Sequence, residues 1–150
     1  MFKIELNTNK KDLKEISLMH KDFKEGLIEG IRKSMYLAEA TAKKRMGKAG
    51  ELNVRTGHLR RSITSRVEDK GDAVVGSIGS AIVYSRINEL GGTIRPKVQK
   101  YLKFQIDGHW VSKKKVTIPA RPYLKPSIEE NFDKIRKIII ESITRKVNNG

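Results

Sequence analysis

The chain has 150 residues, of which 37% are hydrophobic and 33% charged, with no cysteine and a formal net charge of +15. One core can be built from this length and apolar content, so we expect a single domain over residues 1–150. The cysteine count excludes disulfides, thiolate zinc sites and thiol nucleophiles within this sequence, and neither a signal peptide nor a membrane-spanning stretch is predicted.

Apolar side chains recur every three or four residues in the first third of the chain. They are Phe23, Leu27, Ile31, Met35, Ala38, Ala42 and Met46. This spacing predicts one apolar stripe of a long helix over residues 21–48. Gly47 and Gly50 mark its end, and residues 47–54 are predicted to form a loop.

The apolar period then changes to two, which is typical of β-strands. Residues 63–67 alternate, a Lys70-Gly71-Asp72 turn follows, and residues 73–78 are predicted to complete a β-hairpin. Residues 82–90 are expected to form a short helix that ends at Gly91 and Gly92.

A second hairpin is predicted further along the chain. Leu102, Phe104 and Ile106 alternate with polar residues, and Asp107-Gly108 is a strong signal for a two-residue turn. The return strand is expected over residues 110–118.

The last part of the chain has the pattern of a helix. Ser127 and Glu130 have the spacing of a capping box, and apolar residues repeat at helical intervals from Ile128 to Val147. The whole pattern predicts an α+β fold. Its two hairpins would form an antiparallel four-stranded sheet packed against the long N-terminal and the C-terminal helix, with a short helix between the hairpins.

The positive charge is concentrated in two segments. Residues 41–66 contain eight Lys or Arg and one acid, and residues 95–125 contain nine Lys or Arg and one acid, so the rest of the chain is balanced. Such concentration favours a face that meets nucleic acid or an acidic protein surface. A solvated basic surface is the alternative interpretation.

No residue pattern predicts an enzyme, a metal site or a cofactor. His20, His58 and His109 lack metal-ligand spacing, and Glu89 has no acidic or histidine neighbour with which to form a dyad. The Gly-Ser-Ile-Gly run at 76–79 lacks the Lys-Ser/Thr of a phosphate loop and is interpreted as a place of close backbone packing. Zinc-finger and basic-zipper spacings are absent, and aromatic residues, at 6%, offer few surfaces for base stacking.

Three short motifs carry a resemblance to a known family. The first contains Arg55, Thr56, Gly57, Leu59, Arg60, Arg61 and Ile63; the second runs from Tyr84 to Gly92; the third is Ile118-Pro119-Ala120-Arg121-Pro122-Tyr123-Leu124. In this order they resemble the phage virion-morphogenesis and tail-completion proteins, the tail-terminator-like or neck components of long-tailed bacteriophages and prophages. The resemblance covers about residues 50–135.

Each motif also has a structural interpretation. Thr56-Gly57 would turn the chain sharply, so that Leu59 and Ile63 enter the core while the two arginines that follow Leu59 stay outside. In the second motif, Ile87 and Leu90 are expected to point inward and Glu89 to lie at the helix end. Pro119 and Pro122 would stiffen the strand exit and display Arg121.

The resemblance implies an assembly function that works by binding alone. Copies of the chain would form a ring that closes the head-proximal end of the tail tube and joins it to the head, first in the bacterial host cytoplasm and then in the virion. The implied partners are the chain itself, tail-tube protein and head-tail connector protein, with no membrane. A sheet edge or a long basic loop meeting an acidic patch on the next subunit would supply a closing interface. Contacts with neighbours are predicted at Arg55, Arg60, Arg61, Glu89, Lys113, Lys114, Lys115 and Arg121.

Other functions stay open at this point. A basic face could line a channel that passes DNA, with Lys113, Lys114 and Lys115 touching the DNA. A nucleic-acid-binding protein of the host would also explain the charge, and a small enzyme such as a nuclease is the third possibility.

Overall fold

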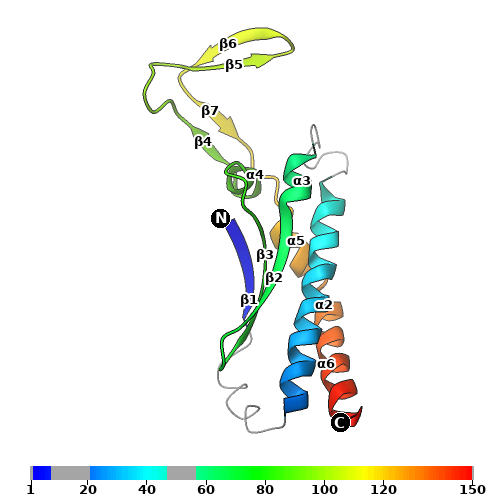
Figure 1. The fold of residues 1–150 in the computed structure, drawn as a ribbon. Helices are drawn as coiled ribbons and strands as arrows, with labels where there is room; N and C mark the ends of the chain where they lie inside the picture. The colour runs from blue at the N-terminus through cyan, green and yellow to red at the C-terminus, as the bar shows by residue number, and fades with distance from the viewer. Residues whose placement is uncertain (1, 8–20, 47–56, 150) are drawn as a thin grey trace.

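The computed structural model describes residues 2–7, 21–46 and 57–149. Two parts are visible in Figure 1: a long body of helices and a sheet, and an arm that projects from one end of it. None of the helices in these ranges is long and apolar enough to cross a membrane.

The body is built on one three-stranded antiparallel sheet. Its strands are β1 (Phe2–Asn7), β2 (Ile63–Asp69) and β3 (Val74–Ser80), in the order β1-β3-β2. The first predicted hairpin is therefore confirmed as β2 and β3. The N-terminal strand β1 was not predicted, and it pairs with the second edge of β3, with Ile4 opposite Ile78.

Helix α2 (Lys21–Arg45) covers one face of this sheet and confirms the long N-terminal helix. The residues of its predicted stripe from Leu27 to Met46 are buried. At Gly76 of β3, a Cβ atom would lie 2.8 Å from side-chain atoms of both Ile31 and Met35. The small residues of the Gly-Ser-Ile-Gly run thus make room for α2, and the close neighbours at Gly76 are side chains rather than backbone.

The C-terminal helix is broken in two, which the sequence pattern did not predict. Helix α5 (Leu124–Glu129) is followed by α6 (Phe132–Asn149). Ser127 does not cap a helix: it is buried inside α5, where its hydroxyl donates to the carbonyl of Leu124 at 2.6 Å. At the break, the Asn131 amide donates to the carbonyl of Ser127 at 2.9 Å and to the hydroxyl of Thr41 on α2 at 3.1 Å.

The predicted four-stranded sheet is wrong. The second hairpin, β5 (Leu102–Ile106) with β6 (His109–Lys113), forms a sheet of its own, and β4 (Gly92–Ile94) pairs with β7 (Val116–Ile118) in another. The predicted return strand over 110–118 is accordingly split. The third strand of the body sheet is β1 on the second edge of β3, and the second hairpin lies in the arm instead (Figure 1).

Helix α6 packs along α2, so the expectation that both long helices lie directly on the sheet holds for α2 alone. Two glycines of α2 allow this approach. A Cβ atom on Gly26 would lie 2.7 Å from the Cα of Ile143, and one on Gly30 would lie 2.8 Å from the Cα of Ile139. The backbones of the two helices therefore meet more closely than any larger residue permits.

The substitution Gly30→Ala tests this contact. Alanine favours a helix over glycine by about 1 kcal/mol, but the added methyl group must push α6 away at a cost of about 1–3 kcal/mol. We expect urea denaturation to show lower stability than in the parent chain. The matched control is Ala40→Gly, an exposed position of the same helix, where only the propensity loss of about 1 kcal/mol should appear. Higher stability for Gly30→Ala would contradict the close packing of α2 and α6.

Candidate assembly interface

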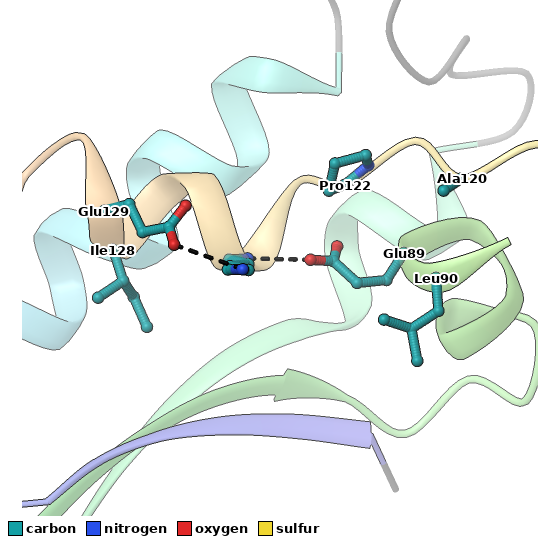
Figure 2. A pocket seen from close by; sticks show the side chains of 7 residues that line it. Glu89, Leu90, Ala120, Pro122, Ile128 and Glu129 are labelled. Carbon is teal, nitrogen blue, oxygen red and sulfur yellow. Dashed lines mark hydrogen bonds and ion pairs between the residues drawn. The ribbon is translucent and has the colours of Figure 1, made fainter.

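The base of the arm is held by the carboxylate of Glu89. This residue belongs to α4 (Ser85–Leu90), the short helix predicted between the hairpins. Its two oxygens accept hydrogen bonds from the backbone N–H groups of Tyr123, Leu124 and Lys125, with N···O distances of 2.8, 2.9 and 2.9 Å. Figure 2 shows the side chain pointing from α4 to the start of α5.

The three donors are N–H groups at the start of α5, which have no partner within their own helix. Tyr123 at the N-cap makes no side-chain capping bond, so the cap comes from Glu89, which is 34 residues away in the chain. A carboxylate suits this place because the N-terminal end of a helix carries partial positive charge. Glu89 is only 2% exposed, and these charge-assisted hydrogen bonds satisfy its buried carboxylate.

The expected inward orientation of Leu90 is therefore wrong, whereas Ile87 is half-buried and Glu89 does lie at the helix end. Leu90 points outward and is 56% exposed, whereas Glu89 is buried. The apolar pattern suggested the reverse, because a carboxylate inside a protein is favourable only where several donors converge on it. Those donors belong to the third motif, and the sequence does not reveal that the two motifs meet.

Further bonds tie the second motif to the third. The hydroxyls of Ser85 and Tyr123 lie 2.7 Å apart, and the N–H of Arg121 donates to the carbonyl of Asn88 at 2.8 Å. Burial raises the pKa of the Tyr123 hydroxyl, which keeps it protonated and able to donate. Tyr84 lies at the N-cap of α4, next to this contact.

Gly91 brings the two motifs together at the backbone. It ends α4 with a φ of 70°, and a Cβ atom there would lie 2.7 Å from the backbone nitrogen of Ala120. Gly92 then begins β4, whose pairing with β7 places Gly92 opposite Ile118. Pro119 and Pro122, both exposed, lie on the segment that leads from β7 into α5.

The first motif reaches the same region through the core. Gly57 has a φ of 70° before α3 (His58–Ser62), which confirms the predicted sharp turn. Leu59 and Ile63 are buried in one cluster with Tyr123 and Leu124. Arg60 and Arg61 are exposed on α3, at the end of the body from which the arm projects (Figure 1), while Arg55 and Thr56 lie outside the described residues.

A shallow groove of about 600 Å³ lies beside the Glu89 anchor. Its walls are mostly apolar and include Leu90, Ala120, Pro122 and Ile128 (Figure 2). Glu129 stands at the rim, 3.6 Å from the ammonium group of Lys125. This groove was not predicted, because it forms only where the second and third motifs meet.

The arm contributes nothing to the core. No residue between Gly92 and Ile118 is buried. Its two short ladders are closed at the tip by the predicted turn, where Asp107 and Gly108 have φ values of 49° and 83°. Large apolar side chains are exposed along it: Ile94, Val98, Tyr101, Ile106 and Trp110.

The arm is also strongly basic. Its residues from 92 to 118 include seven Lys or Arg and one acid. Lys113, Lys114 and Lys115 are all exposed and follow one another at the end of β6 and in the link to β7. The end of β6 and the link to β7 lie out in the arm, away from α4 (Figure 1), so the structure does not bring these lysines together with Glu89.

A family model matches residues 32–144, about three quarters of the chain, and it describes the phage virion morphogenesis family. The chain belongs to this family. No curated protein and no solved structure matches the chain.

The matched range contains all three motifs, the groove and the entire arm of this virion morphogenesis protein. Within residues 2–7, 21–46 and 57–149, no group of three or more His, Asp or Glu side chains could hold a metal ion. His109 lies exposed on the arm and His58 on α3, while His20 is outside these ranges.

Replacing Glu89 tests the anchor. Glu89→Ala leaves buried N–H groups without an acceptor, so we expect a loss of about 3 kcal/mol in urea denaturation, and a smaller loss for Glu89→Gln. The amides of Tyr123, Leu124 and Lys125 should also exchange faster with deuterium. The control Glu129→Ala removes an exposed ion pair and should cost at most about 0.5 kcal/mol. Equal losses for the two alanine variants would contradict the anchoring role of Glu89.

Proposed function

We propose that this chain is the subunit of a closed ring that completes the phage tail and joins it to the head. The observation that carries the proposal is the arm, which exposes five large apolar side chains and has no buried residue. A two-stranded hairpin is marginally stable alone in water, and its exposed apolar surface favours burial against another protein.

The family supports a role in building the virion, and a ring explains how one kind of arm could be covered in every copy. When the arm of each subunit contacts a different surface on the next, the contact is heterologous, and such contacts generate rings when the rotation closes. The chain would act by binding alone, without a catalytic step. It would assemble in the bacterial host cytoplasm and remain in the tail or neck of the virion.

The proposed outer partners are tail-tube protein and head-tail connector protein. Arg60, Arg61 and Arg121 favour such contacts, because they are exposed close to the base of the arm and arginine is enriched at interfaces (Figure 1). Glu89 is buried and accepts a hydrogen bond from the backbone of Tyr123, so it is better explained as the anchor of the arm than as a contact with a neighbouring protein.

A shortened arm tests the ring. Ile94 and Val116 are direct partners in the ladder of β4 and β7, so residues 95–115 can be replaced by Asn-Gly, a two-residue turn suited to closing a hairpin. We expect the parent chain, alone or with tail-tube protein, to form closed rings in electron micrographs and native mass spectra. The shortened chain should stay monomeric.

The body provides the control for this experiment, because it keeps its core when the arm is shortened. Its circular dichroism spectrum and cooperative unfolding should be preserved. Rings formed by the shortened chain would show that the arm is not the assembly element. A parent chain that is monomeric under both conditions would overturn the ring itself.

DNA binding is the second candidate function, and the excess of basic residues in the arm favours it. We expect any shift of duplex DNA in gels to weaken steeply as salt rises, since phosphate contacts release counterions. Reversing Lys113, Lys114 and Lys115 to glutamate should abolish a shift that arises from the arm. Absence of a shift for the parent chain even at low salt would exclude this function.

A further inference from the structure

We propose that one face of the arm tip binds the phosphate backbone of duplex DNA. This donor face consists of the side chains of Lys103, Gln105, Trp110 and Ser112. The inference rests on DNA binding, the second candidate function, and names the surface that performs it. In the proposed ring, the opposite face of the same hairpin stays available for contact with the next subunit.

The ladder of β5 and β6, at the far end of the arm, defines the two faces of the hairpin (Figure 1). Residues directly opposite each other share a face, and alternate residues of one strand point the same way. Lys103 lies opposite Ser112, and Gln105 lies opposite Trp110, so these four residues share the donor face. All four are exposed. The other face is mostly apolar, and its side chains are Leu102, Phe104, Ile106 and Val111, with His109 and Lys113 at its ends.

The donor face matches the chemistry of a phosphate group. The lysine ammonium and the tryptophan indole donate hydrogen bonds and accept none, and the glutamine amide and the serine hydroxyl can donate as well. Phosphate oxygens of DNA accept hydrogen bonds, and lysine, glutamine and serine are among the side chains that contact them. The face contains no acid that would repel a phosphate.

The positive charge of the arm is not compensated within the chain. In the body, basic side chains pair with acids, as Lys24 does with Asp69 at 2.8 Å and Lys33 with Glu29 at 2.9 Å. Among the described residues, none of the seven basic side chains of the arm forms an ion pair, and all seven are exposed. A segment with so much unbalanced charge attracts an anionic partner.

The kind of basic residue favours DNA over an acidic protein as that partner. Six of the seven are lysines, and Arg95 is the one arginine. Lysine is depleted at protein–protein interfaces, where arginine is enriched, whereas both residues contact DNA phosphates. A two-stranded β-ribbon such as β5 and β6 is also narrow enough to enter the major groove of B-DNA.

Fluorescence of Trp110 tests the donor face directly, because it is the only tryptophan of the chain. We expect a short DNA duplex, added to the full-length protein at low salt, to quench and shift the emission of Trp110. Added salt should reverse the change, since phosphate contacts release counterions.

The matched control moves the tryptophan to the other face of the hairpin. The double variant Trp110→Phe, Phe104→Trp keeps Lys103 and the two other donors, so it still binds DNA and can be saturated at a higher concentration. Its emission should then stay unchanged. A response equal to that of the parent chain would overturn the assignment of the donor face.

Salt dependence provides a second readout, because each phosphate neutralised by a lysine adds about 0.9 to the slope of log K against log salt. Lys103→Ala should therefore lower this slope by about 0.9, whereas Lys113→Ala, on the other face, should leave it unchanged. Trp110→Phe removes an uncharged donor and should weaken binding about tenfold at an unchanged slope. The opposite order of the two lysine variants would overturn the proposal.

An acidic polypeptide separates the two classes of anionic partner. Polyglutamate, added at the same total charge as the DNA, should change the Trp110 emission far less than DNA does, and an equal or larger change would overturn DNA as the partner. If DNA shifts in gels but neither the Trp110 emission nor the Lys103→Ala slope responds, the donor face is wrong and DNA binding stands. Absence of any shift at low salt overturns both, while native mass spectra test the ring independently.

Discussion

The hydrogen bonds that the carboxylate of Glu89 accepts are the interaction on which the geometry at the base of the arm depends. It gathers three backbone donors at the start of α5 and thereby fixes α4, the exit of the arm and the start of the C-terminal helices relative to one another. Burying an acid is costly, and the cost is offset here because each oxygen is aimed at amide groups that would otherwise lack a partner. The close approach of Gly91 to Ala120 completes the same junction.

The elements set by local periodicity could be predicted from the sequence. The stripe of α2, the hairpin of β2 and β3, and the Asp107-Gly108 turn depend on neighbouring residues, and all three are confirmed. The α+β class follows from them. The turn at Gly57 and the burial of Leu59 and Ile63 were predicted for the same reason.

The contacts between distant segments could not be predicted in this way. Ser127 has a capping-box spacing, yet it is buried inside α5, a helix that packs against α2. The sequence also does not show which strands pair, because several strands have a similar alternating pattern. The pairing of β1 with β3 and the separate sheet of the second hairpin are two examples. Glu89 is buried and Leu90 exposed, which is the reverse of the expectation. The sequence pattern missed this because the donors for the carboxylate lie more than 30 residues away.

In the proposed ring, the junction and the arm would have complementary mechanical roles. A heterologous contact closes only if each subunit is rotated by the same angle relative to the last, and it otherwise generates an open helix. An arm that swung freely at its base could not fix that angle, however well its tip were bound. The Glu89 anchor, the backbone contact at Gly91 and the two prolines after β7 restrict the base of the arm. In the proposed ring, these same residues would therefore also set the direction in which the arm points toward the next subunit.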